Sequence, residues 1–252
     1  DLWGMFVPRW HWFALSLFAA LAVAAFYLLS TPNIYTRTAA ILVKDDTKGG
    51  SSTTMSEFSD LGIFRSNTNI NNELLTLKSP TLMTEVVRRL GLNETYTVRK
   101  GLKDVGLYKS NPVAVSYRHQ DETPVSFKID FSSKEEFTIS DVMINGEESE
   151  TEFSGKMGDS IRMEVGTFVI NPTKYWNDSF VGTSIRYNKG SVRAVTDYYA
   201  TALRADLGNE DATIINLSID DVSIPKAEDI LNTLIEVYNE KWIQDKNQIA
   251  VS

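Results

Sequence analysis

The sequence predicts an α+β protein with an N-terminal transmembrane helix, a sheet domain of antiparallel or mixed strands packed with helices, and a long C-terminal helix. Three observations support this fold class. An apolar run lies near the N-terminus, short alternating segments fill the middle of the chain, and the last residues have the apolar period of a helix. Strands that follow one another without intervening helices favour an α+β rather than a βαβ arrangement.

The apolar run extends from Trp12 to Leu29 and contains no charged residue. At about 1.5 Å per residue, a helix of this length spans roughly 27 Å, close to the roughly 30 Å hydrocarbon thickness of a bilayer. The amphipathic rings of Trp10, Trp12 and Tyr27 lie near its two ends, and such rings are typical of the membrane–water interface. We therefore predict a transmembrane helix over residues 12–30, with these three aromatic residues at the membrane interface.

Two other interpretations of the apolar run remain open. Ala22-Val23-Ala24 is a small-x-small pattern of the kind that signal peptidase cleaves, which makes a removable signal peptide the first alternative. The second is the core helix of a soluble protein, although a core helix is rarely apolar on all sides over this length. The length of the run and the aromatic residues at its N-terminal end favour an anchor that is not cleaved.

The charges around the run do not settle its orientation. Only Arg9 precedes it, whereas Arg37, Lys44 and Lys48 follow it, and by the positive-inside rule this places the N-terminus outside. The sequence does not begin with Met, however, and large domains translocate largely regardless of their own charge. We therefore expect residues 1–11 on the cytoplasmic side.

Small residues form a stripe along one face of the predicted transmembrane helix. Ser16, Ala20 and Ala24 are spaced four residues apart, and such a stripe lets a second transmembrane helix approach closely. Alanine is also an ordinary apolar residue, so the stripe has a second explanation. We take Ser16, Ala20 and Ala24 as candidate residues for helix packing in the membrane.

A strand, a loop and two helices follow the anchor. Residues 35–46 predict a strand, and the Gly/Ser/Thr-rich segment after them predicts a long loop. The second helix begins at Ser79-Pro80, a capping hydroxyl before a proline at the first helical position, and ends at Gly91. The residues expected on the apolar faces of the two helices are Ile70, Leu74, Leu77, Leu82, Val86, Val87 and Leu90.

The rest of the chain alternates between strand and helix signals. Residues 95–187 contain short segments separated by Asn, Gly, Pro and Asp clusters, which predict a meander of antiparallel strands. A helix over 191–199 is followed by a hairpin of strands 201–207 and 212–219, in which Thr213, Ile215, Leu217 and Ile219 share one face. A long helix begins at Pro225. Its expected apolar face is formed by Ala227, Leu231, Leu234, Tyr238, Trp242 and Ile249.

We therefore divide the chain into four parts. Residues 1–11 form a cytoplasmic or interfacial N-terminus and 12–30 the transmembrane helix. Residues 31–224 form the α+β domain, and 225–252 form the start of a long projecting helix that is expected to continue beyond Ser252, because no C-capping signal ends it.

Composition and missing motifs exclude most chemistry. The net charge of −8 is the wrong sign for nucleic acid, and the absence of cysteine excludes disulfides and thiolate sites. No P-loop, G-x-S-x-G or G-x-G-x-x-G motif occurs. The histidines are His11, at the membrane edge, and His119, so a site that needs two histidines is nearly excluded. We predict no catalytic residue, no metal ligand and no cofactor-binding residue in this chain.

Two acidic pairs and two aromatic pairs were the remaining candidates for carbohydrate chemistry. Asp220-Asp221 and Glu147-Glu148 are neighbours in sequence, but adjacent residues of a strand point to opposite faces. Tyr175-Trp176 and Tyr198-Tyr199 have rings able to stack on sugars, although aromatic residues near strands more often lie in a core or interface. We expect these pairs to be structural.

The order of the segments resembles a known family. An anchor, "IYTRTAAILVKDD", "NNELLTLKSPTLMTEVVRRLGL" and "TIINLSIDDVSIPKAEDILNTLIEVYNEKW" follow one another as in the chain-length determinant (polysaccharide co-polymerase, Wzz-type) family. The chain is most similar to the N-terminal part of bacterial capsule or exopolysaccharide tyrosine autokinases (Wzc-like). The resemblance rests on residues 12–46, 69–92 and 212–252, and residues 95–187 carry little of it.

The resemblance implies a place and a role. The α+β domain is expected in the periplasm beside the bacterial inner membrane, with the lipid bilayer, the polysaccharide, a polysaccharide polymerase and the outer-membrane export machinery as partners. It also implies ring-like homo-oligomers, a returning second transmembrane helix and, in some members, a cytoplasmic tyrosine kinase domain. No kinase motif and no second span occur in this sequence, so no catalytic residue is carried over.

Two other functions remain open. The first is a periplasmic sensor or adaptor domain of a membrane signalling protein, which also places a globular domain beside a span. The second is a membrane-anchored carbohydrate-active enzyme, which requires two carboxylates that converge in a cleft.

Overall fold

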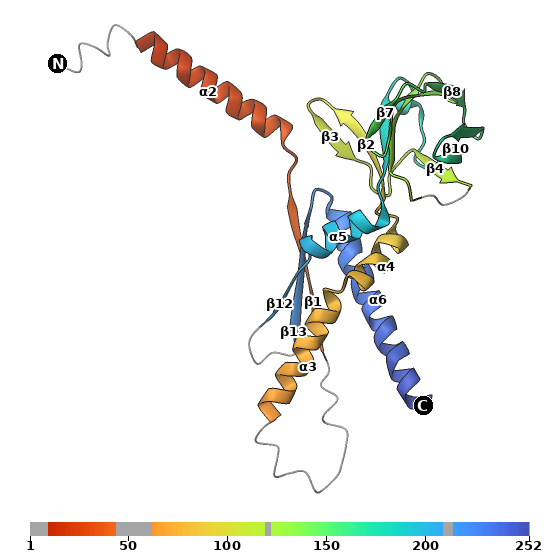
Figure 1. Cartoon of the computed structure of the whole chain (residues 1–252). Coiled ribbons are helices and arrows are strands. Elements are labelled where there is room, and N and C mark those ends of the chain that lie inside the picture. Colours follow the sequence, from red (N-terminus) through yellow and green to blue (C-terminus); the bar gives the residue numbers. More distant parts are fainter. Residues whose placement is uncertain (1–9, 44–61, 119–121, 209–213, 252) are drawn as a thin grey trace, which may run out of the picture.

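The computed structural model of the protein describes residues 10–43, 62–118, 122–208 and 214–251. Its first element is helix α2 (Trp10–Ser30), which stands apart from the other helices and strands (Figure 1). No residue of α2 is buried. The helix ends just before Pro32, whose ring lacks the N–H group that a continuing helix needs. The predicted N-terminal helix is therefore confirmed as a helix, and it begins slightly earlier than predicted, at Trp10.

The chain leaves α2 through a strand that pairs with a strand near the other end of the sequence. The elements are β1 (Tyr35–Leu42), β12 (Arg204–Leu207) and β13 (Ile214–Asp221), which form a three-stranded sheet in the order β1-β13-β12. Both pairings are antiparallel. The predicted β12–β13 hairpin is confirmed, whereas the pairing of β1 with β13 has no signal in the local sequence.

Two of the expected strand boundaries differ from the structure. The strand predicted over residues 35–46 ends at Leu42, and residues 44–46 lie outside the described part of the chain. The strand predicted to begin at residue 201 was wrong at its start, because helix α5 (Val192–Ala202) continues to Ala202. The Ser191 side chain accepts a hydrogen bond from the Ala194 N–H (3.1 Å) and caps the first turn of α5.

Helices cover this sheet and build the first hydrophobic core. They are α3 (Gly62–Leu77), α4 (Pro80–Leu90), α5 and α6 (Ile224–Val251). The predicted caps of α4 are confirmed. The Ser79 side chain accepts a hydrogen bond from the Thr81 N–H (3.2 Å), and Gly91 adopts the left-handed conformation with φ 61°.

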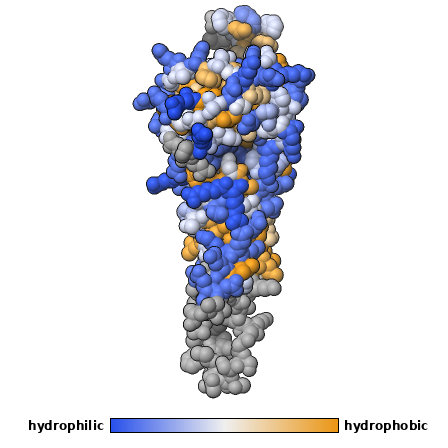
Figure 2. Space-filling view, turned by 90° about the vertical axis from the view of Figure 1, so that its right-hand side faces the viewer, coloured by the Kyte–Doolittle hydropathy of each residue, from blue (hydrophilic) through white to orange (hydrophobic). Residues whose placement is uncertain are grey.

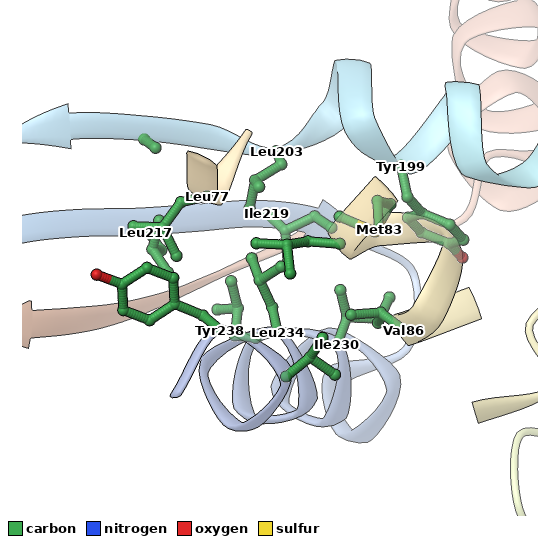
Figure 3. Packing of buried hydrophobic residues seen from close by; sticks show 14 of the residues in the cluster. Leu77, Met83, Val86, Tyr199, Leu203, Leu217, Ile219, Ile230, Leu234 and Tyr238 are labelled. Atoms are coloured by element: carbon green, nitrogen blue, oxygen red, sulfur yellow. The ribbon is translucent and has the colours of Figure 1, made fainter. Parts of the chain in front are cut away.

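The first core joins segments from both ends of the sequence. Figure 3 shows Ile230, Leu234 and Tyr238 of α6 next to Leu217 and Ile219 of β13. The predicted apolar residues of α4 and β13 lie in this core, with Leu90 only partly buried and with Thr213 outside the described residues. The buried members of this core include Ile41, Leu77, Leu82, Met83, Val86, Val87, Tyr199, Leu203, Ile215, Leu217, Ile219, Ala227, Ile230, Leu231, Leu234, Val237 and Tyr238.

Helix α6 changes its surroundings along its length. One face of its first half is buried from Ala227 to Tyr238, so this face belongs to the core. Farther along, Trp242 is 41% exposed and Ile243 is 54% exposed. The predicted apolar face therefore leaves the core before Trp242, and the side chain of Ile249 lies outside the described residues.

The middle of the chain forms a separate body of strands, inserted between α4 and α5. The strands are β2 (Glu94–Lys100), β3 (Lys103–Gly106), β4 (Val113–Tyr117), β5 (Val125–Phe131), β6 (Glu136–Ile144), β7 (Glu147–Ser149), β8 (Phe153–Lys156), β9 (Ser160–Met163), β10 (Gly166–Pro172) and β11 (Ser184–Lys189). They form a seven-stranded sheet, in which β8 pairs with β6 beside the row β3-β2-β11-β5-β6-β7, and a smaller sheet β4-β10-β9.

These two sheets enclose a second hydrophobic core. Every pairing between the described strands of this body is antiparallel, so the predicted antiparallel strands are confirmed. The predicted meander was wrong in strand order, because β11 lies between β2 and β5 and β10 pairs with β4, pairings between strands far apart in the sequence. Phe127 contacts both Phe168 and Tyr187 near its centre, with ring centroids 5.4 Å and 5.0 Å apart. The face of the molecule in Figure 2 is predominantly hydrophilic, with small hydrophobic areas between polar residues.

Candidate functional site

Helix α2 presents the predicted interface residues at its two ends. Trp10 and Trp12 lie in the first turn and Tyr27 lies in the last turn, and these side chains are 68%, 65% and 66% exposed. Among the described residues, α2 is the one helix whose length and apolar composition suffice to cross a membrane. An exposed apolar helix with aromatic residues at both ends is typical of a membrane span.

The small-residue stripe lies along the middle of α2. The Ser16 hydroxyl donates a hydrogen bond to the Phe13 carbonyl (3.0 Å), so its polar group is satisfied within the helix. Ala20 and Ala24 follow at one-turn intervals on the same face. The stripe is therefore compatible with an apolar environment and with close approach of another helix.

An ion pair ties the first strand after α2 to the β12–β13 hairpin. Arg204 donates two hydrogen bonds to the Asp220 carboxylate, at 2.9 and 2.8 Å, and the Thr36 hydroxyl donates a third at 2.5 Å. The hydrogen bonds from Arg204 and Thr36 hold the pKa of Asp220 below its usual value. This cluster crosses all three strands of the sheet.

The neighbouring Asp221 points to the other side and contacts helix α6. Its carboxylate lies 2.9 Å from the Lys226 ammonium and accepts hydrogen bonds from the Ser223 N–H (2.8 Å) and the Tyr199 hydroxyl (3.3 Å). Asp220 and Asp221 therefore lie on opposite faces of β13, and they do not converge on one substrate. This arrangement fixes the start of α6 on the end of the sheet nearest to α2.

A polar pocket of about 480 Å³ lies where the strand body meets α4 and α5. Lys189 of β11 lines it and is only 5% exposed, with its ammonium 4.1 Å from the centroid of the Tyr117 ring. Burial raises the pKa of the Glu94 carboxyl, against the opposite effect of the nearby Lys189 charge. Arg88 and Glu122 also line the pocket. Its charges and hydroxyl groups suit a polar ligand.

A second groove, of about 500 Å³, lies between α4 and α6. Arg89 of α4 donates hydrogen bonds to both carboxylate oxygens of Glu240 of α6, at 2.9 and 2.6 Å, and to Glu85 at 2.9 Å. The hydrogen bonds from Arg89 lower the pKa of Glu240. This bidentate contact joins the two helices beyond the end of the buried core.

The order of elements at the N-terminus agrees with one family model. An exposed apolar helix leads into β1, and the helices α3 and α4 follow. Residues 1–90 match the family model of Wzz, the chain length determinant protein. The resemblance found in the sequence is therefore confirmed over this part of the chain. The comparison with curated proteins found no match.

The Wzz match supports a chain-length determinant role in polysaccharide biosynthesis. It covers α2, β1 and the helices up to the end of α4, and the inserted strand body and the β13–α6 unit lie after the matched residues. Together, the match and the exposed apolar helix are consistent with a membrane-anchored protein.

The other candidate residues of the chain lie apart from one another. Glu147 and Glu148 lie on the short strand β7, where both are exposed, and Tyr198 is 62% exposed whereas Tyr199 is buried in the first core. Tyr175 is 41% exposed, and the ring of Trp176 packs on Phe131 with centroids 4.7 Å apart. Within the described residues, no group of three or more His, Cys, Asp or Glu side chains could hold a metal ion. His119 lies outside the described residues.

Lys189 and the contact between Arg89 and Glu240 were not among the residues predicted from the sequence. The spacing of Glu85 and Arg89, four residues apart on one helix, was a visible signal for an ion pair. Nothing local marked Lys189 as buried, because its surroundings come from β4 and β2 as well as from its own strand.

Proposed function

We propose that the protein is a membrane-anchored oligomeric scaffold that regulates the chain length and export of a bacterial surface polysaccharide, either a capsule or an exopolysaccharide. The observation that carries this proposal is the Wzz match over residues 1–90, which includes the exposed apolar helix α2. The chain is then the non-catalytic part of a tyrosine autokinase whose kinase domain follows a second transmembrane helix.

The connection from α2 to α6 supports a scaffold role. Because Tyr35 pairs with Asp221, β13 runs back toward α2, and α6 begins at that end of the sheet. From there its 28 residues extend about 42 Å. Figure 1 shows the C-terminal end of α6 far from α2. With α2 in the bacterial inner membrane and the α+β domain in the periplasm, α6 projects away from the membrane.

The proposed partners are further copies of the chain in a ring, a polysaccharide polymerase, the outer-membrane export machinery and the polysaccharide. The pocket around Lys189 is the proposed contact for the polysaccharide, because carboxylates, cations and a tyrosine lie side by side there. Sugar hydroxyl groups both donate and accept hydrogen bonds, so such a mixed surface suits them.

The test is deletion of the gene in its own host, with the surface polysaccharide run on a gel beside that of the parent strain. We expect a collapsed or unregulated length distribution that the intact gene restores. Complementation with Glu122→Gln tests the pocket, and Glu147→Gln, on the exposed strand β7, is the matched control. An altered distribution with Glu122→Gln alone would support the pocket as a polysaccharide contact.

Two outcomes would contradict the proposal in different ways. An unchanged polysaccharide ladder, with an unchanged amount of polysaccharide, would reject the chain-length role and favour a sensor or adaptor domain. A changed ladder without any phosphotyrosine on the full-length protein would keep the chain-length role and reject the autokinase.

A further inference from the structure

The hairpin of β2 and β3 forms one edge of the seven-stranded sheet. Its strands are joined by Gly101 and Leu102, and Lys100 lies directly opposite Lys103 at the end of the ladder. Gly101 adopts a φ of 62°, a conformation that glycine takes without strain and that a tight two-residue turn requires. The hairpin therefore presents a defined tip.

The tip carries positive charge on an acidic chain. Like charges directly opposite each other on a hairpin repel, and in the described part of the chain neither Lys100 nor Lys103 forms a salt bridge. Arg99 adds a third positive charge, and its contact with Asp104 is long, at 4.0 Å. An anionic partner would relieve this repulsion, whereas nothing in the described fold does.

The same tip exposes apolar side chains. Leu102 is 49% exposed and Val105 is 38% exposed, so apolar surface lies beside the two lysines. Basic residues next to exposed apolar residues are typical of protein surfaces that enter the headgroup region of a membrane. Lysine suits this place because its alkyl chain lies along apolar surface while its ammonium reaches the phosphates.

The position of the hairpin agrees with such a contact. Figure 1 shows the tip of the β2–β3 hairpin pointing toward the C-terminal end of α2, where the chain leaves the apolar helix. If α2 spans the bilayer, this end of α2 marks the membrane surface. Leu75 of α3 is also exposed, at 66%, but α3 lies toward the end of the β1–β13 sheet that is farther from α2 in this view.

We propose that the β2–β3 tip docks on anionic lipid headgroups of the membrane that α2 spans, with Leu102 in the interface and Lys100 and Lys103 on the phosphates. The contact gives the strand body a second attachment to the membrane beside α2. It rests on the proposed function, because it requires α2 to be inserted.

The test uses the whole chain in lipid nanodiscs with one fluorophore at a time. Because the sequence contains no cysteine, each introduced cysteine is labelled uniquely. An uncharged bimane label is placed at Leu102→Cys, at Leu75→Cys as the matched exposed leucine, and at Phe18→Cys within α2. Quenching by nitroxide-labelled lipids is measured in phosphatidylcholine discs and in discs that also contain phosphatidylglycerol.

We expect strong lipid quenching at position 102 in the anionic discs and weak quenching at position 75. A lysine near an anionic surface contributes about fivefold to binding, so Lys100→Ser with Lys103→Ser should shift the docking equilibrium by roughly 25-fold. Lys134→Ser with Lys156→Ser makes the same change in net charge at exposed lysines elsewhere in the strand body and should leave the quenching unchanged.

Three results would overturn the proposal. Equal quenching at positions 102 and 75, with strong quenching at position 18, would reject docking and leave the anchor intact. Equal quenching at position 102 in neutral and anionic discs would reject the anionic headgroup as the partner. Absence of quenching at position 18 would reject the anchor, and docking with it.

Discussion

Tyr35, the first residue of β1, lies directly opposite Asp221, the last residue of β13. This pairing brings the residues that follow α2 next to the residues that precede α6. The ion pair between Arg37 and Glu228 (3.1 Å) adds a direct contact between β1 and α6. Helices α2 and α6 are therefore connected through one sheet and one core, and a change in this core should affect both.

The core contact of α6 is tested by Leu234→Ala. Leu234 is fully buried and lies next to Leu217 and Ile219 (Figure 3). Loss of its side chain should leave a cavity and lower the free energy of unfolding by about 2–5 kcal/mol. The measurement is urea unfolding in detergent, followed by far-ultraviolet circular dichroism. The control is Leu75→Ala, at a residue that is 66% exposed, and it should change the free energy of unfolding by less than about 0.5 kcal/mol. Equal effects of the two substitutions would contradict the burial of α6.

The end of α4 is tested by Gly91→Ala. Gly91 has a φ of 61°, and no atom lies within 4 Å of the position that a Cβ would take. The cost is therefore backbone strain alone, about 1 kcal/mol. Gly91→Asn should cost less, because asparagine tolerates the left-handed conformation. Gly106→Ala, at a site that is equally open but lacks a positive φ, is the control and should not destabilise the chain. The same urea unfolding measurement tests this prediction. An unchanged free energy of unfolding in Gly91→Ala would argue against the left-handed cap of α4.

The cluster around Asp220 predicts a dependence of stability on pH. Hydrogen bonds from Arg204 and Thr36 lower the pKa of Asp220 from its usual 3.8 in the folded chain, so the unfolded chain binds this proton first as the pH falls. The stabilisation is complete above the unfolded value and is lost as the pH drops through the lower, folded value. Asp220→Asn should therefore lower the unfolding midpoint at pH ~7 and have little effect near pH ~2.

The exposed Asp197 of α5 is the control for this pH dependence. Its side chain forms no ion pair in the described part of the chain, so Asp197→Asn should unfold like the parent chain at both pH values. If Asp220→Asn lowered the unfolding midpoint equally at both pH values, the contacts of Asp220 with Arg204 and Thr36 would not stabilise the fold through the carboxylate charge.

The small-residue stripe of α2 is tested by Ala20→Ile. A larger side chain at this position should keep a second helix at a greater distance and weaken association. Fluorescence energy transfer between labelled chains in micelles measures the association, and we expect weakening of roughly fivefold, equivalent to about 1 kcal/mol. Ala22→Ile lies about 200° around the helix and is the matched control. Equal weakening by both substitutions would reject the stripe as a packing surface.

Local features of this fold were predictable from the sequence because each depends on a few neighbouring residues. Ser79 and Gly91 mark the start and the end of α4 by their capping geometry, and the alternation of Ile215, Leu217 and Ile219 marks one buried face of β13. The end of α5 was not predictable in the same way, because residues 201–202 carry a strand pattern and the helix nevertheless continues through them. Which residues make up each of the two cores was not predictable either, since each core collects residues from distant segments.

In the candidate site too, the residues marked by their sequence neighbours were predictable, and those positioned by distant segments were not. Trp10, Trp12 and Tyr27 were found from their places beside an apolar run, and their high exposure agrees with that prediction. Lys189 was not found, because a lysine in a strand is ordinarily solvated, and its burial here comes from neighbours on other strands, among them Tyr117 and Glu94.

By itself, the sequence determined the apolar helix, the caps, the presence of short antiparallel strands and the Wzz resemblance, because these features reside in residues close together along the chain. Only the tertiary structure decided that β1 pairs with β13, that α6 starts at the end of the sheet nearest α2, and that the β2–β3 tip points toward α2. The physical reason is that strand pairing across long stretches of chain depends on complementary buried faces, and many segments of similar composition offer such a face.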